Sequence, residues 1–232
     1  MTVIVTGVSG GIGKAIVDHY LKEGKQVIGI GRKNSTNHAN YRFIQCDLND
    51  SEQIQNIQLS ILSGSVLLVN NAGVLGQIGR LSENNQADIA QVLQVNVVAA
   101  IELTKKVYAS LMDQNQFTLV NISSGAALRP IPSWLAYCSS KAAMNMFSMC
   151  FYEEEKQRGN KLRVYSVSPG VVDTKMQGQI RESTTEEFSE AQRFKDLKAN
   201  DELWPPEEVA SRLALLLEKP FGGEVVCDLR SV

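Results

Sequence analysis

Seven short runs of apolar, mostly β-branched residues recur along the chain, and longer segments with helical spacing separate them. Most of these runs are apolar at consecutive positions, which is the pattern of parallel strands covered on both faces. Strands that alternate with helices are typical of βαβ units, whose right-handed crossovers place helices on both sides of one sheet. We therefore predict an α/β fold, a doubly wound domain with a mostly parallel seven-stranded sheet flanked by helices. The expected strands are Val3–Thr6, Gln26–Ile30, Arg42–Cys46, Val66–Asn70, Phe117–Ile122, Leu162–Val167 and Glu224–Cys227, and the expected helices are Gly11–Glu23, Ser51–Leu62, Ala87–Met112, Trp134–Arg158 and Glu207–Glu218.

Length and composition limit the possible classes of protein. A chain of 232 residues with 44% hydrophobic and 21% charged residues is typical of one soluble globular domain. Its formal charge of −2 offers no electrostatic basis for binding nucleic acid or an anionic membrane. The N-terminus has the pattern of a strand rather than of a signal peptide, and the four cysteines and two histidines lack metal-ligand spacing. We expect one cytoplasmic domain over residues 1–232, with no metal site and no nucleic-acid or membrane partner.

The segment 173–204 breaks the alternation, because it is long, polar and rich in charge. An insertion of this length in a compact domain is usually a functional lid or a disordered segment. Helical spacing within Glu186–Leu197 favours a mobile lid. Pro205 and Pro206 then begin the next helix, where a missing N–H is tolerated.

A glycine-rich turn directly follows the first expected strand and opens the first helix. Gly7, Gly11 and Gly13 have the spacing G-x-x-x-G-x-G. Glycines allow positive φ and let backbone N–H groups approach a phosphate, and the helix N-terminus favours an anion. A tight structural turn is the alternative for this motif alone, but its place between the first strand and the first helix favours a Rossmann-type dinucleotide site.

The end of the second expected strand distinguishes between the two nicotinamide dinucleotides. In dinucleotide folds a carboxylate at this point binds the ribose 2′-hydroxyl, whereas an arginine accommodates a 2′-phosphate. This chain has Gly31 followed by Arg32 and Lys33, which favours NADP over NAD, although two basic residues can also merely solvate a loop. Asp47, after the third strand, is a candidate acceptor for the adenine amino group; capping of the following turn is the alternative.

Tyr137 and Lys141 lie four residues apart in a helical pattern, so the phenol and the ammonium share one helix face. A nearby cation stabilises phenolate, and we expect it to lower the tyrosine pKa toward neutrality. A tyrosine with such a pKa can donate a proton to a carbonyl oxygen. The pair alone is weak evidence, because ordinary amphipathic helices contain similar pairs by chance.

Further polar residues follow the expected strands on the same side. Ser123 and Ser124 end the fifth strand, where a serine can donate a hydrogen bond to a carbonyl that gains negative charge, or can simply cap the connection. The motif Asn70-Asn71-Ala72-Gly73 ends the fourth strand. Asn96 interrupts an apolar helix and must be hydrogen-bonded there, as a functional residue or as a satisfied core amide.

Together these motifs resemble the compact branch of the short-chain dehydrogenases/reductases, from residue 1 to about residue 175. The resemblance rests on Thr6–Gly13, Asn70–Gly73, Asn96, Ser124, Tyr137, Lys141 and Pro169-Gly170. It implies that Tyr137 is the proton donor in reduction, that Lys141 lowers its pKa and binds the nicotinamide ribose, that Ser124 orients the substrate carbonyl, and that Asn96 holds a water in a proton relay. The cofactor contacts it implies, together with those inferred above, are Gly7, Ser9, Gly11, Ile12, Gly13, Arg32, Lys33, Asp47, Leu48, Asn71, Ala72, Gly73, Tyr137, Lys141, Pro169, Gly170, Val172 and Thr174.

The last third of the chain is similar to a narrower group, the benzil reductases and sepiapterin-reductase-like enzymes, through Pro169–Met176, Gln179–Arg181 and Gly223–Asp228. The chain lacks the Asp-Gly-Gly ending of many tetrameric members, so we expect a homodimer formed by Ala87–Met112 and Trp134–Arg158. Candidate substrate contacts are Leu75, Ala126, Trp134, Val171, Met176 and Trp204, each of which is as easily core or lid packing.

The function we predict is NADPH-dependent reduction of a small apolar ketone or diketone to an alcohol. A pteridine or 3-oxoacyl reductase with the same site is the alternative among enzymes. A non-catalytic NADP-binding regulator is the alternative from another class. The presence of Ser124, Tyr137 and Lys141 counts against the regulator, because a sensor needs no tuned proton donor.

Overall fold

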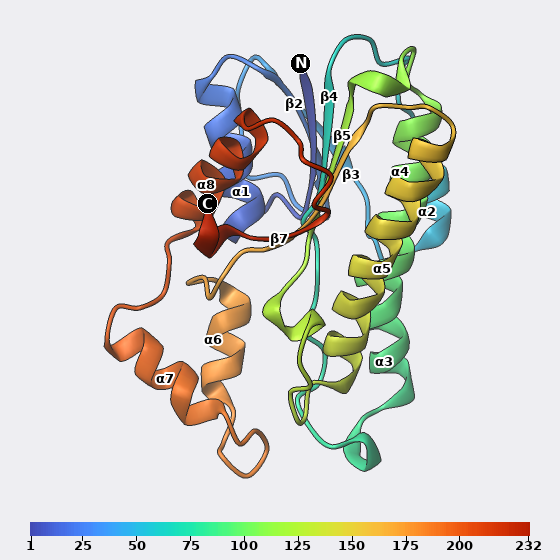
Figure 1. Ribbon diagram of the computed structural model, residues 1–232. Coiled ribbons are helices and arrows are strands. Elements are labelled where there is room, and N and C mark those ends of the chain that lie inside the picture. The colour runs from blue at the N-terminus through green and yellow to red at the C-terminus, as the bar shows by residue number, and fades with distance from the viewer.

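The computed structural model describes residues 1–232. Seven parallel strands form one sheet in the order β3-β2-β1-β4-β5-β6-β7 (Figure 1). The predicted α/β fold is confirmed, and the sheet is parallel throughout rather than mostly so. Its strands are β1 (Thr2–Thr6), β2 (Gln26–Gly31), β3 (Tyr41–Gln45), β4 (Val66–Asn70), β5 (Phe117–Ile122), β6 (Arg163–Ser168) and β7 (Val226–Asp228), each close to its expected bounds.

Alternate residues of the central strands face two separate apolar layers. On β1, Val3 and Val5 pack into a core with α1 (Gly11–Lys22) and α8 (Pro206–Glu218), while Ile4 packs into a second core. That second core lies under α2 (Ser51–Gln55), α4 (Ala99–Ala109) and α5 (Leu135–Gln157). Because both faces are covered, the central strands are apolar at successive positions.

Two expected helices differ from the structure. The helix predicted over Ser51–Leu62 ends at Gln55, because Leu62 pairs through its backbone N–H and carbonyl with Ser110 and Met112 beyond α4. The helix predicted over Ala87–Met112 is divided into α3 (Gln86–Leu93), a π-helical turn over Gln94–Val98 and α4. A π-helical turn inside an α-helix is often found at a functional site, and this turn contains Asn96.

The segment 173–204 contains two helices, α6 (Lys175–Glu182) and α7 (Ala191–Ala199), so the helix expected over Glu186–Leu197 begins later. Both helices project beyond the carboxyl ends of the strands, on the side of α1 and α8 (Figure 1). Phe188 and Phe194 pack against Trp134, with ring centroids 5.0 and 5.6 Å away. We refer to residues 173–204 as the lid segment. Aromatic packing holds it against the start of α5.

Candidate active site

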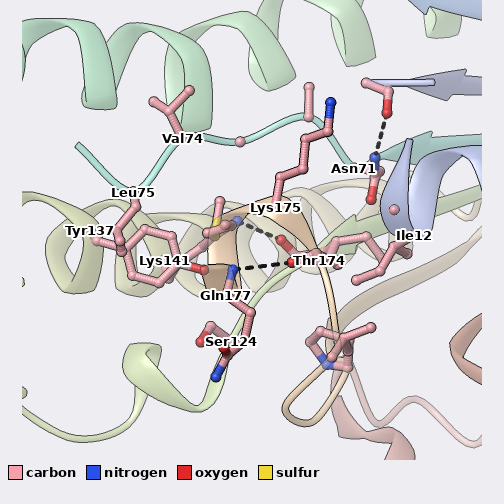
Figure 2. A pocket seen from close by; sticks show the side chains of 18 of the residues that line it. Ile12, Asn71, Val74, Leu75, Ser124, Tyr137, Lys141, Thr174, Lys175 and Gln177 are labelled. Atoms are coloured by element: carbon pink, nitrogen blue, oxygen red, sulfur yellow. Dashed lines mark hydrogen bonds between the residues drawn. The ribbon is translucent and has the colours of Figure 1, made fainter. Parts of the chain in front are cut away.

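A cavity of about 850 Å³ opens at the carboxyl ends of the strands (Figure 2). Residues that follow each of the seven strands contribute to its wall, and α5 and the lid segment close its other sides. In open α/β sheets ligands bind at this edge, on either side of the point where the strand order reverses. Here that point lies between β1 and β4, which are adjacent in the sheet.

The glycine-rich turn is shaped by close approach of the β4 loop. Gly7 has φ +72°, and a Cβ at this position would lie 2.9 Å from Ala72 Cα. A Cβ on Gly13 would lie 2.4 Å from both Gly7 O and Asn71 Nδ2. The Asn71 side chain donates hydrogen bonds to Thr6 O and Gly7 O, at 2.8 and 3.3 Å. Gly13 therefore allows tight packing behind the turn, whereas Gly7 and Gly11 line the cavity, so that the backbone of the turn is open to a pyrophosphate.

The adenosine end of the cavity contains the predicted basic residues. Arg32 and Lys33 are exposed and line it beside Gly31, with no carboxylate at that position. Asp47 also lines it, but its Oδ1 accepts a hydrogen bond from Asn49 N at 3.0 Å, which is the turn-capping alternative. A nicotinamide dinucleotide fits these features, because the glycine turn and the open end of β2 are where its phosphates and adenosine ribose would lie.

Tyr137 and Lys141 point into the same part of the cavity from successive turns of α5 (Figure 2). The Lys141 Nζ lies 5.6 Å from the centroid of the Tyr137 ring and donates a hydrogen bond of 2.7 Å to Ile122 O at the end of β5. Both side chains are buried. The predicted juxtaposition of phenol and ammonium is therefore present.

Burial changes the pKa of both groups, but not in the way predicted for the phenol. Desolvation raises the pKa of Tyr137 from 10.0 to about 12, and the nearby Ser124 hydroxyl opposes this rise. Desolvation lowers the pKa of Lys141 from 10.5 to about 8. The expectation that Lys141 lowers the Tyr137 pKa toward neutrality is wrong for this structure, because removal from water dominates and the opposing effect comes from Ser124 rather than from Lys141. The phenol is protonated at neutral pH, which is the form that can donate a proton.

Asn96 does not line the cavity but connects two of its walls. Its Oδ1 accepts from Val74 N at 2.8 Å, and its Nδ2 donates to Val74 O at 2.9 Å and to Ser140 Oγ at 3.0 Å. Ser140 Oγ donates to Tyr137 O at 2.7 Å. The Asn96 side chain therefore uses its hydrogen bonds to hold the β4 loop against α5. Because its polar atoms are occupied, a water in the proton relay expected from the sequence would have to bind another atom of the π-helical turn.

The structure separates the two serines that the sequence left ambiguous. The Ser123 hydroxyl donates to Asn145 Oδ1 at 2.7 Å inside the core. The Ser124 oxygen lines the cavity and accepts from Ala126 N at 3.1 Å, so its O–H remains available as a donor. Ser124, rather than Ser123, is the serine that a substrate carbonyl can reach.

The other predicted residues fall largely where expected. Twenty-three of the predicted cofactor, catalytic and substrate positions line the cavity; they are Gly7, Ser9, Gly11, Ile12, Arg32, Lys33, Asp47, Leu48, Asn71, Ala72, Gly73, Leu75, Ser124, Ala126, Trp134, Tyr137, Lys141, Pro169, Gly170, Val171, Val172, Thr174 and Met176. Gly13, Asn96 and Trp204 do not line it. Trp204 is wrong as a substrate contact, because its ring stacks under the Arg212 guanidinium at 4.4 Å, and its backbone pairs with Val172.

Several residues that line the cavity were not predicted, and five of them come from the lid segment. Gln177, Ile180 and Phe194 face it, as do Arg129 and Ile131 from the loop before α5. Helical spacing in 175–182 would have placed Met176, Gln177 and Ile180 on neighbouring positions of one helix face. The direction of that face depends on how the lid segment packs, which no local pattern specifies.

A family model described as short chain dehydrogenase matches residues 1–185. The chain belongs to this family. It is 35% identical over 238 residues to a benzil reductase ((S)-benzoin forming) of Bacillus subtilis, covering 98% of this chain and 97% of that protein. It is also 35% identical over 158 residues to a sepiapterin reductase of Meriones unguiculatus, covering 66% of this chain and 58% of that protein.

The fold of this short-chain dehydrogenase also matches solved structures. A short-chain dehydrogenase/reductase of Saccharomyces cerevisiae superimposes with a TM-score of 0.81 at 27% identity, covering 98% of this chain and 95% of the other. Among solved structures with this fold, a 4-hydroxyisoleucine dehydrogenase contains NADH and a serine dehydrogenase contains NADP⁺. One fold therefore accommodates either cofactor.

The buried ammonium of Lys141 predicts a pH-dependent stability. Since its folded pKa of about 8 lies below the unfolded value of 10.5, the unfolded chain binds more protons between these values and stability rises with pH there. The cost in folding free energy of burying the charged Lys141 ammonium is fully present below pH 8 and is on the order of 3 kcal/mol. The wild type should therefore gain stability relative to Lys141→Met from pH 8 to pH 10 in urea unfolding. An exposed-site control, Lys22→Met, should run parallel to wild type; a constant gap between wild type and Lys141→Met would contradict the burial effect.

Proposed function

We propose that this short-chain dehydrogenase reduces a small apolar ketone or diketone to an alcohol with NADPH. The observation that carries this proposal is the convergence of Ser124, Tyr137 and Lys141 on one wall of the cavity whose far end contains Arg32 and Lys33. The similarity to benzil reductase, which the chain matches over nearly its full length, supports a carbonyl substrate.

The proton step follows from the geometry of α5 and the end of β5. A bound nicotinamide cofactor would supply the hydride to the carbonyl carbon. Tyr137, whose pKa lies well above neutrality so that the phenol is protonated, donates the proton to the carbonyl oxygen. Ser124 donates a second hydrogen bond that orients the same oxygen as negative charge develops. The Lys141 ammonium, held by Ile122 O, stabilises the phenolate that remains, and it would also bind the nicotinamide ribose of a bound cofactor.

The substrate side of the cavity is predominantly apolar. Leu75, Ala126 and Tyr137 belong to one buried cluster with Trp134 and Ile180, and Val171 and Met176 pack against it. Such a surface favours an aromatic or alicyclic carbonyl compound. The similarity to sepiapterin reductase keeps a pteridine substrate as the second candidate, so a substrate panel should contain both classes.

We further propose a cytoplasmic homodimer formed through α4 and α5. Ile101 on α4 is 37% exposed and Met146 on α5 is 57% exposed. Ala142, Met146 and Cys150 are exposed at intervals of four residues on one face of α5. The helical stretch Gln86–Ala109 is long and apolar enough to cross a membrane by length and composition, and 33% of its apolar window is buried. A second copy of this chain would cover this apolar face.

Replacement of the proton donor tests the mechanism. Tyr137→Phe should lower the rate of NADPH oxidation with benzil by at least about 10³-fold, because the proton donor is lost. NADPH should still bind, as measured by the change in protein fluorescence on titration. A variant with wild-type turnover would exclude Tyr137 as the donor. Wild-type protein that binds NADPH but reduces no compound of a carbonyl and pteridine panel would instead favour the regulator.

The basic residues after β2 predict the cofactor preference. Arg32→Ala should raise the KM for NADPH roughly 10- to 100-fold, as expected for loss of a charge-assisted hydrogen bond, and should leave the KM for NADH unchanged. Gly31→Asp should reverse the preference toward NADH, because a Cβ there lies 3.8 Å from Val8 N and is accommodated. Equal use of both cofactors by wild type, unaltered in Arg32→Ala, would contradict the assignment.

The dimer predicts a specific response to charge on the apolar face. Ile101→Lys combined with Met146→Lys should convert the protein from dimer to monomer in light scattering, because two cations would be buried without partners. Leu215→Lys places the same charge on an exposed apolar position of α8, on the other side of the sheet, and should leave the dimer intact. Monomeric wild type that binds phospholipid vesicles would show that a membrane covers the face.

A further inference from the structure

Gln177 lies on the lid helix α6 and is buried with 3% exposure, although its side chain is polar. It lines the cavity that contains Ser124 and Tyr137 (Figure 2). Its neighbours on the helix, Met176 and Ile180, pack with Leu75 and Tyr137 in the apolar cluster of the substrate side. Gln177 is therefore a polar group within an apolar wall, at the reacting end of the cavity rather than at the adenosine end.

The orientation of the Gln177 amide is determined by an arginine. The Arg181 guanidinium donates a hydrogen bond to Gln177 Oε1 and lies 3.6 Å from the Asp173 carboxylate. A guanidinium has only donors, so the amide atom that faces it must be the oxygen. The amide nitrogen, with its two N–H donors, is consequently turned away from Arg181.

That nitrogen has no hydrogen-bond partner in the protein. Seven buried side-chain atoms lack a partner, and only Gln177 Nε2 and Trp134 Nε1 belong to residues that line the cavity. The Trp134 ring packs against Phe188, Phe194 and Tyr137, so packing sets its position. The Gln177 amide is instead held by a polar contact. A buried donor without a partner is unfavourable, and such an atom in a binding cavity indicates a ligand acceptor.

We propose that Gln177 donates a hydrogen bond to a second acceptor oxygen beside the carbonyl that is reduced, and so selects 1,2-dicarbonyl compounds over simple ketones. This inference rests on the proposed carbonyl reductase function. Ser124 and Tyr137 bind the reacting oxygen, and the apolar cluster binds the two flanking groups. Gln177 supplies the polar contact that distinguishes a diketone from a monoketone of the same shape. A site with a buried donor discriminates in this way because a substrate without the acceptor leaves that donor unpaired.

Two substrates that differ only at the second oxygen test this role. Benzil has two adjacent carbonyls, and deoxybenzoin has the same skeleton with one carbonyl replaced by a methylene. Gln177→Met should lower kcat/KM for benzil about 10-fold, the effect of one lost hydrogen bond, and lower kcat/KM for deoxybenzoin less than about 2-fold. Gln177→Glu, which retains the shape and the acceptor for Arg181 but lacks the donor, should behave like Gln177→Met.

Binding provides a readout that does not depend on turnover. Benzil should bind the complex of Gln177→Met with NADP⁺ about 10-fold more weakly than the wild-type complex in calorimetry, and the KM for NADPH should stay at the wild-type value. The control is Gln179→Met, on the exposed side of the same helix, which should change neither substrate. Equal losses for both substrates, wild-type behaviour of Gln177→Glu, or weakened NADPH binding would each overturn the role of Gln177. If wild type reduces neither compound, the proposed function fails while the binding titration still decides the role of Gln177.

Discussion

The site of this short-chain dehydrogenase depends on the hydrogen bonds of one buried amide. Asn96 pairs with both backbone groups of Val74 in the β4 loop and with Ser140 on α5, and Ser140 in turn bonds to the Tyr137 carbonyl. The β4 loop forms one wall of the cavity, while α5 contains Tyr137, the proposed proton donor. A single side chain thus sets the separation between the two walls, and the π-helical turn directs it inward.

The same arrangement explains the electrostatic state of the site. Packing α5 against the sheet removes Tyr137 and Lys141 from water, which raises the phenol pKa and lowers the ammonium pKa. Both shifts arise from the same cause, because desolvation disfavours whichever form is charged. The protein tolerates a buried ammonium because Ile122 O accepts from it. Stability is reduced at this position, where the proposed chemistry needs a proton donor beside a cation.

The lid segment completes a cavity whose other walls come from the sheet and α5. Phe188 and Phe194 pack it against Trp134, and Asp173 binds both Arg181 and Lys198. These contacts join α6 and α7 to the end of β6 and to the start of α5, and they present Gln177 and Ile180 to the cavity. In the function proposed here, the lid segment therefore recognises the acceptor oxygens of the substrate, whereas residues of β5 and α5 carry out the proton transfer.

The sequence by itself determined the elements whose signal is local. Consecutive apolar runs identified the parallel strands, and the spacing of Gly7, Gly11 and Gly13 located the glycine-rich turn between β1 and α1. The four-residue interval of Tyr137 and Lys141 placed both on one face of α5, because helical geometry alone sets that face.

Only the tertiary structure decided the properties that depend on burial and on distant partners. It distinguished Ser124 from Ser123, whose hydroxyl donates to Asn145. It also showed that Trp204 does not face the substrate side, because Arg212 covers its ring. It also reversed the expected direction of the Tyr137 pKa shift. Desolvation and the satisfaction of a hydrogen bond depend on which residues from elsewhere in the chain pack around a group, and periodicity contains no information on those neighbours.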